Sequence, residues 1–199
     1  QYKYLENVPV GYSLYENFLT AIMGKNQKRQ GLIDNILLQL MTFYCYDELK
    51  IVIFTTKEKE SHWNYLKYSN YCFDNNKSIR YFASSLEESK EICDALTPEL
   101  NYRIQISESK NISPTPHYII ICENYNIVNK LNFFKTLTEL DANIGYSTII
   151  LSKSLNNLPS KCSNFINLSD DGVSGILKNS YESQEAIKFT DEIDRKSVV

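Results

Sequence analysis

The 199-residue sequence has little glycine and proline, two histidines, one tryptophan and no long apolar run. Six glycines and five prolines exclude collagen-like and low-complexity chains. The longest apolar runs, at residues 36–40 and 118–122, are far too short to cross a bilayer. The polar, aromatic N-terminus carries no signal-peptide pattern. We therefore expect a soluble piece and, because it starts at Gln1 without Met, a piece of a longer chain.

The net charge and the reactive side chains exclude further classes of function. The formal net charge of −3 gives no reason to expect a nucleic-acid partner. No CxxC pair is present, so neither a zinc site nor a redox motif is predicted, and reduced cytosolic thiols are expected. His62 and His117 fall in different elements without a G-x-S-x-G motif, so structural roles are predicted for them and no catalytic or metal-binding residue is expected. The five cysteines are Cys45, Cys72, Cys93, Cys122 and Cys162.

Apolar patterning along the chain alternates between strand-like runs and helical spacing. Strands are expected at residues 18–23, 49–55, 79–83, 118–122, 148–152 and 165–168. Helices are expected at 32–44, 84–106 and 126–140, with a short helical piece at 62–68. Ser85 and Glu88 form a capping-box pattern. This alternation predicts one α/β domain over residues 1–184, with a parallel sheet covered on both faces, and a polar linker over 185–199.

The first strand-to-helix turn, Gly24 to Gly31, is where such folds bind phosphate. A working P-loop reads G-x-x-x-x-G-K-[ST]. Aligned on Gly24, the second glycine is Arg29, the lysine is Gln30 and the hydroxyl residue is Gly31. Arg29 adds a side chain where backbone must approach phosphate, Gln30 carries no charge and Gly31 cannot bind Mg²⁺.

The turn by itself supports two interpretations. It is either a P-loop that has lost its defining residues or an unrelated basic loop that follows a strand. Lys25, Lys28 and Arg29 also leave open weak anion binding at the helix N-terminus.

The second segment to compare with a nucleotide site is the apolar strand at 118–122, which is followed by Glu123 and Asn124. A Walker B strand ends in Asp-Glu, where the Asp lies near Mg²⁺ and the Glu polarises water. Here the carboxylate pair is missing. Glu123 is either a remaining catalytic carboxylate or a solvated strand-end residue, and the pattern favours the second interpretation.

Several stretches, in order, resemble the FtsK/SpoIIIE-type ATPases, and more closely the first, degenerate ATPase-like domain of the EssC/YukB ATPase of Gram-positive type VII secretion. The resemblance covers roughly residues 10–178. It rests on LQLMTFYCYDELKIV (38–52), WNYLKY (63–68), IRYFA (79–83), PHYIII (116–121) and GYSTIIL with LPSKC (145–151 and 158–162). It implies a RecA-like, P-loop NTPase-like fold.

The resemblance also points to a third altered element of the nucleotide site, after the P-loop and the Walker B strand. Working motors of this family carry a sensor segment of the type ATQRP on the strand after Walker B, and Lys153 stands where its glutamine would be. It therefore implies a domain that binds no cofactor, with ATP and Mg²⁺ used by later domains of a membrane-anchored, homo-oligomeric protein at the cytoplasmic face. The implied partners are those domains, membrane subunits and secreted substrates.

Three functions remain open at this point. The first is a non-hydrolysing module that couples the membrane part to the motor domains. The second is an atypical ATPase that uses Lys25 or Lys28 for phosphate and Glu123 as base. The third is a binding module for a secreted substrate or partner subunit, motivated by the aromatic cluster Trp63, Tyr65, Tyr68 and Tyr71. Packing of a short helix is an equally weighted interpretation of that cluster.

Overall fold

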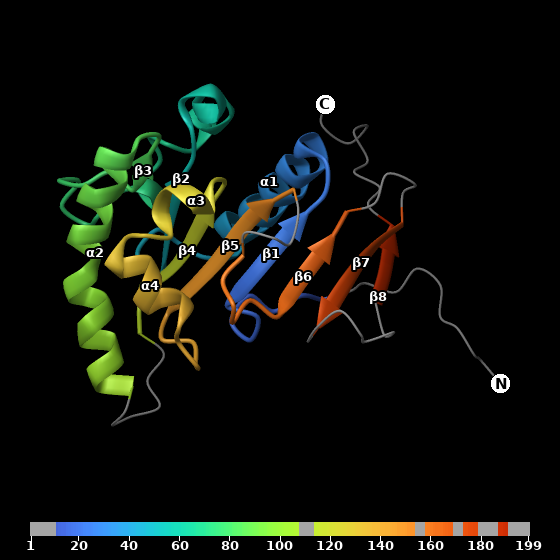
Figure 1. Ribbon diagram of the computed structural model, residues 1–199. Helices are drawn as coiled ribbons and strands as arrows, with labels where there is room; N and C mark the ends of the chain where they lie inside the picture. The colour runs from blue at the N-terminus through green and yellow to red at the C-terminus, as the bar shows by residue number, and fades with distance from the viewer. Residues whose placement is uncertain (1–10, 108–113, 154–157, 169–172, 179–186, 191–199) are drawn as a thin grey trace.

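The computed structural model describes residues 11–107, 114–153, 158–168, 173–178 and 187–190, the last two by their backbone. Its centre is one eight-stranded sheet in the order β3-β2-β4-β5-β1-β6-β7-β8 (Figure 1). The first six strands in this order are parallel, and β7 and β8 extend the sheet antiparallel. The α/β fold class with a parallel sheet is confirmed.

The parallel strands are β1 (Leu19–Met23), β2 (Leu49–Phe54), β3 (Phe82–Ala83), β4 (His117–Cys122), β5 (Tyr146–Ser152) and β6 (Asn164–Asn167). Every residue of β1 and β2 is buried. Strands covered on both faces have no solvent side, so they appear in the sequence as continuous apolar runs. These runs are the reason why the sequence alone located the strands within a few residues.

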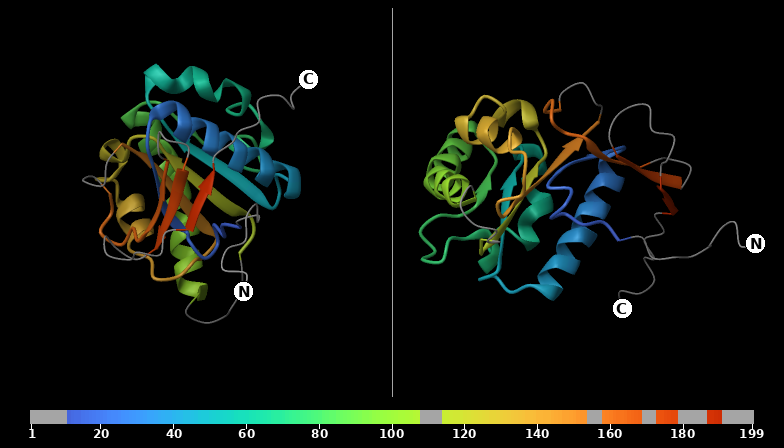
Figure 2. Two further views of the ribbon diagram at one scale, coloured as in Figure 1. Left: turned by 90° about the vertical axis from the view of Figure 1, so that its right-hand side faces the viewer. Right: turned by 90° about the horizontal axis from the view of Figure 1, so that it is seen from below.

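Helices cover both faces of the sheet (Figures 1 and 2). On one face lie α1 (Asn26–Phe43) with the 3-10 segments η1 (Lys57–Tyr65) and η2 (Asn70–Cys72). On the other lie α2 (Leu86–Ser107), α3 (Tyr125–Val128) and α4 (Asn132–Thr138). In the right-hand view of Figure 2, α2 and α4 lie above the sheet and α1 below it.

Helix α2 begins with the capping box that the sequence predicts. The Glu88 N–H donates to Ser85 Oγ at 3.2 Å, and the Ser85 N–H donates to Glu88 Oε2 at 3.2 Å. Pro98 lies inside this helix and does not end it. Among the described residues, no helix is long and apolar enough to cross a bilayer.

Three sequence-based expectations need correction. The expected helix at 126–140 is two helices, because Leu131 adopts an extended conformation before α4 and thereby lets Phe133 and Phe134 pack in the core. The expected strand at 79–83 shortens to β3 plus a bridge between Phe73 and Arg80. Within the expected linker, Ile187–Thr190 forms β8, paired antiparallel with β7 (Val173–Lys178). The boundary at 184 otherwise stays a prediction.

The amino end of the sheet is organised by Arg103, whose side chain is fully buried. Its guanidinium donates to the carbonyls of Gly145 at 3.2 Å and Pro116 at 2.8 Å and to Glu99 at 2.6 Å. It also lies 5.0 Å from the ring centroids of Tyr118 and Tyr146. A Cβ added at Gly145, which has φ +90°, would stand 2.2 Å from this guanidinium. Arg103 thus joins α2 to the starts of β4 and β5.

Candidate functional site

The predicted site residues converge at the carboxyl end of the parallel sheet. Register pairs Met23 of β1 with Ser152 of β5, and Cys122 of β4 with both Ile150 and Phe54. The segments that follow these strands therefore meet along one edge, where open α/β sheets bind ligands. Strand β5 lies between β1 and β4, so the expected sensor position stands between the P-loop and Walker B positions.

Gly24 is required by the backbone of the turn after β1. It has φ +130°, and a Cβ added there would stand 2.7 Å from the carbonyl oxygen of Leu168 after β6. The Leu168 N–H in turn donates to the Met23 carbonyl at 2.9 Å. A residue with a side chain would be strained and would collide here, so this glycine keeps a structural purpose whether or not phosphate binds.

Arg29 is buried in the first turns of α1, at 2% exposure. Its Nη2 donates to Asn26 Oδ1 at 3.2 Å, whereas its Nε is buried and has no hydrogen-bond partner. Burial lowers the pKa of the guanidinium from its ordinary value, and the negative charge of Glu123 opposes this shift. An arginine side chain thus fills buried space at the start of α1.

Glu123 is not a solvated strand-end residue, and the interpretation that the sequence favoured is wrong. Its side chain is fully buried, and three donors surround its carboxylate. Trp63 Nε1 donates to Oε2 at 3.0 Å, Lys59 Nζ donates to Oε1 at 3.2 Å, and the Thr55 hydroxyl donates to Oε2. A carboxylate held in this way by three donors is a poor general base, because most of its lone pairs are engaged and its buried side chain is shielded from water.

The other predicted positions lie on the same edge with less burial. Gln30 accepts a hydrogen bond from Asn26 Nδ2 at 3.1 Å. Asn124 is the residue before α3, and its side chain forms no cap. Lys153 is exposed directly after β5. Lys25 is exposed and directly precedes α1. Lys28 lies in the first turn of the helix, and Gly31 lies within it.

Sequence reasoning missed the three donors to Glu123. Thr55 follows β2, and Lys59 and Trp63 lie in η1. All three lie between 60 and 68 positions before the carboxylate along the chain. The available signal was the single tryptophan beside a basic and acidic segment that follows a buried strand. Because adjacent parallel strands end at the same edge, β2 and β4 bring these segments together.

The aromatic cluster divides into a core residue and surface residues. Trp63 is fully buried, which supports the packing interpretation for it. Tyr65 is 49% exposed and donates to Asp34 of α1, and Tyr68 is 66% exposed. Both histidines are hydrogen-bonded, His62 to Asp34 at 3.0 Å and His117 to Ser147 at 2.8 Å.

Comparison with known proteins gives one sequence relative and several solved structures. No family model matches the sequence. The chain is 19% identical over 193 residues to the ESX secretion system protein YukB of Bacillus subtilis. The alignment covers 97% of this chain and 13% of that protein.

The structural matches are to related secretion proteins. EssC (ATPases 2 and 3) from Geobacillus thermodenitrificans superposes with a TM-score of 0.64 at 15% identity, over 90% of this chain and 40% of that chain. The cytoplasmic domain of the type VII secretion ATPase EccC of Thermomonospora curvata matches with a TM-score of 0.56 at 11% identity, over 82% of this chain and 24% of that chain. EccC (ATPases 2 and 3) has also been solved with a signal sequence peptide, and it matches at 0.53 and 9% identity, over 82% of this chain and 37% of that chain.

The sheet order, the two covered faces and the glycine turn after β1 define a RecA-like α/β domain. With the YukB relationship across nearly the whole chain, this domain is an ATPase-like domain of the EssC/YukB type, from the FtsK/SpoIIIE-type ATPases of type VII secretion. The solved EssC chain contains ATPases 2 and 3, so the assignment to the first domain stays a prediction.

Proposed function

We propose that the chain is a non-hydrolysing, ATPase-like module of a type VII secretion ATPase, and that it is the first, degenerate domain of that protein. The observation that carries this proposal is the burial of Glu123 among Trp63, Lys59 and Thr55. In this arrangement the carboxylate stabilises the η1 segment and does not face a water that could attack phosphate.

The turn after β1 supports the same proposal. Arg29 stands at the position of the second P-loop glycine, and its side chain is buried within range of the charge on Glu123. Gln30 and Gly31 supply neither a cation for phosphate nor a hydroxyl for Mg²⁺. The domain keeps the strand, glycine and helix of a nucleotide site and lacks the groups that would stabilise the triphosphate.

The function of such a module is mechanical. We propose that it couples the membrane part of a longer protein to ATP-binding domains and contributes to oligomer contacts at the cytoplasmic face of the membrane. The relatives support this, because the chain spans 13% of YukB and 40% of the EssC chain with two ATPase domains. Its partners would be those domains, membrane subunits or secreted substrates, since the related EccC has been solved with a signal sequence peptide.

Titration calorimetry with ATP and Mg²⁺, paired with a phosphate-release assay, tests the absence of a nucleotide site. We expect no saturable binding at millimolar nucleotide and no turnover above a boiled sample. A matched variant that combines Arg29→Gly, Gln30→Lys and Gly31→Thr restores the loop motif, and we expect it to bind nucleotide without hydrolysing it, because Glu123 stays buried.

Turnover by the unmodified domain would overturn the proposal, provided that it needs Mg²⁺ and disappears on Lys25→Ala or Lys28→Ala. That result would support the atypical ATPase with a displaced phosphate lysine. Replacement of the exposed Lys135 on α4 by Ala is the control for a nonspecific loss of positive charge.

A further inference from the structure

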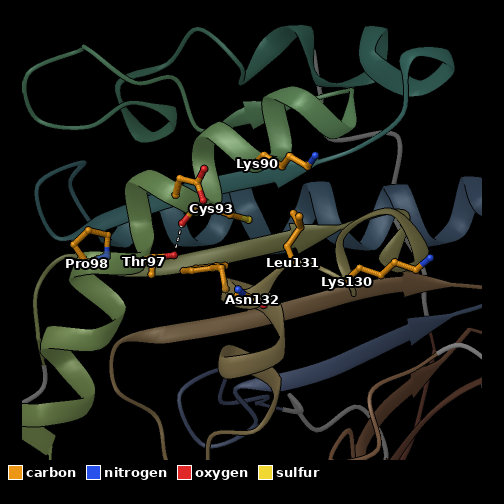
Figure 3. A pocket seen from close by; sticks show the side chains of 9 residues that line it. Lys90, Cys93, Thr97, Pro98, Lys130, Leu131 and Asn132 are labelled. Carbon is orange, nitrogen blue, oxygen red and sulfur yellow. Dashed lines mark hydrogen bonds between the residues drawn. The ribbon is translucent and has the colours of Figure 1, made fainter.

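A groove with a volume of ≈ 450 Å³ lies between α2 and the α3–α4 segment, away from Glu123 (Figure 3). Its floor is apolar: Cys93 and Phe133 are buried core residues, and Leu131 is partly buried beside them. This volume is within the range of sites that take a small ligand or a few residues of a peptide. A groove of this kind, polar at its rim and apolar at its base, has the composition of a recognition site.

Two cations stand at one end of the groove. Lys90 extends from α2 and Lys130 from the α3–α4 connection, and in Figure 3 both side chains reach toward the same side with Leu131 between them. Both lysines are exposed, and within the described part of the chain neither forms an ion pair. Two like charges held near one apolar side chain favour a ligand that brings a negative charge next to an apolar group.

The other end of the groove offers hydrogen-bond acceptors. Pro98 lies there and has no N–H, so the Asp94 carbonyl cannot receive the usual helical hydrogen bond from residue 98. The Asp94 carboxylate also lines the groove. The Thr97 hydroxyl donates to Cys93 O at 2.6 Å, which leaves its oxygen lone pairs as further acceptors. Backbone N–H groups of an incoming chain would match these acceptors.

We propose that this groove binds a short extended polypeptide segment that presents an apolar side chain next to a carboxylate. The apolar side chain would lie on Leu131, Phe133 and Cys93, and the carboxylate would lie between Lys90 and Lys130. Peptide N–H groups would donate to the acceptors at Asp94 and Thr97. The groove lies on the α2–α4 face of the sheet, so this binding does not depend on whether the carboxyl edge binds nucleotide.

The test uses short N-acetylated, C-amidated peptides of the form Ala-Leu-Glu-Ala and Ala-Phe-Glu-Ala, with matched peptides in which Gln replaces Glu. Amide chemical shifts of the isotopically labelled domain are recorded during each titration. We expect saturable shifts at residues 90–98 and 130–133 with the Glu peptides. Affinity should fall roughly two- to five-fold for the Gln peptides and by a similar factor for Lys90→Gln or Lys130→Gln.

Lys135→Gln is the matched control, because Lys135 is an exposed lysine on α4 that does not line the groove, and it should leave the affinity unchanged. Absence of saturable shifts with every peptide would overturn the proposal. Shifts confined to the carboxyl edge around Glu123 would also overturn it, as would equal affinity for the Glu and Gln peptides. N-acetyl-leucine tested alongside distinguishes a peptide site from a site for any small apolar carboxylate, and binding as tight as the peptides would count against a peptide site.

Discussion

Two arginines are buried at opposite ends of the same parallel sheet, and their surroundings differ. Arg103, at the amino end, is fully buried and donates to Glu99, Gly145, Ile144 and Pro116 while it lies between two tyrosine rings. Arg29, at the carboxyl end, is almost as buried, yet its Nε has no partner.

This difference separates an end of the sheet where the buried arginine is held by many acceptors from an end where a buried arginine nitrogen has no partner. Folds are stable when buried polar groups are satisfied, and Arg103 meets that condition with backbone carbonyls that close the sheet. At the carboxyl edge, the Nε of Arg29 has no partner, while Glu123 accepts hydrogen bonds from three other residues. This arrangement is the one expected if the proposed function holds and the edge binds no nucleotide.

The largest effect is expected at the amino end. Arg103→Met should reduce the free energy of unfolding by about 3–5 kcal/mol, because it leaves several buried carbonyls and Glu99 without their donor. Urea unfolding followed by circular dichroism measures this change. Arg103→Lys keeps the charge, but one ammonium group cannot reach all of these acceptors. Its free energy of unfolding should therefore lie between those of the unmodified protein and Arg103→Met. A loss below about 1 kcal/mol for Arg103→Met would contradict the assigned importance of this residue.

The next effect is a pH dependence at the same end. Burial, assisted by the positive charge of Arg103, lowers the pKa of His117 to about 4 from its ordinary 6.5. Between these values the unfolded chain binds a proton at residue 117 and the folded chain does not. The contribution of His117 to the free energy of unfolding is therefore fully present above pH 6.5. It should be lost as the pH drops from 6.5 to 4, which lowers the stability by about 3 kcal/mol at most.

Urea midpoints measured across this pH window check the prediction. His117→Gln removes the titrating group and can still donate to Ser147, so the difference between the two proteins isolates the histidine from the many carboxylates that titrate nearby. Parallel pH profiles for the two proteins would contradict the assignment, as would a titration near pH 6.5 of the ring-proton signal that disappears in His117→Gln.

A smaller effect is expected at the carboxyl edge. Glu123→Gln removes the negative charge that accepts hydrogen bonds from Lys59 and Trp63. It should reduce the free energy of unfolding by about 1–2 kcal/mol. Because Trp63 is the only tryptophan of the chain, its fluorescence reports this site directly, and we expect the emission to shift. Glu139→Gln, at an exposed acid that pairs with Lys161, is the control and should change neither quantity. Unchanged fluorescence in Glu123→Gln would show that the tryptophan does not depend on the carboxylate.

The smallest effect sharpens the comparison. Arg29→Met should change the free energy of unfolding by less than about 1 kcal/mol, because the guanidinium forms few hydrogen bonds and Glu123 keeps its three donors. Thermal and urea unfolding measure this difference beside Arg103→Met. A loss as large as that of Arg103→Met would show that both ends of the sheet are equally structural.

Much of the fold could be predicted from the sequence because its signals are local. The strands β2, β4 and β5 are continuous apolar runs, and the capping box of α2 lies within four residues. The break between α3 and α4 was missed because apolar spacing continues through Leu131, and packing decides where the chain turns. Strand β8 was missed because it is only four residues long and alternates apolar with polar residues instead of forming an apolar run, and pairing with β7 makes it a strand.

The candidate site was predicted by position and misjudged in its chemistry. The turn after β1 and the end of β4 were located from their strands, and the three altered positions were read directly from the residues at 29–31. The burial of Glu123 depended on Trp63 and Lys59, which approach it from another strand and leave no mark in the local sequence.

The sequence by itself determined an α/β alternation, a glycine turn without P-loop chemistry and a resemblance to secretion ATPases, because these depend on residue type and short-range spacing. Tertiary structure decided which charges are buried and which groups satisfy them. Desolvation and hydrogen bonding depend on neighbours that are distant in sequence, so Arg29 and Arg103 look alike as residues and differ as parts of the folded molecule.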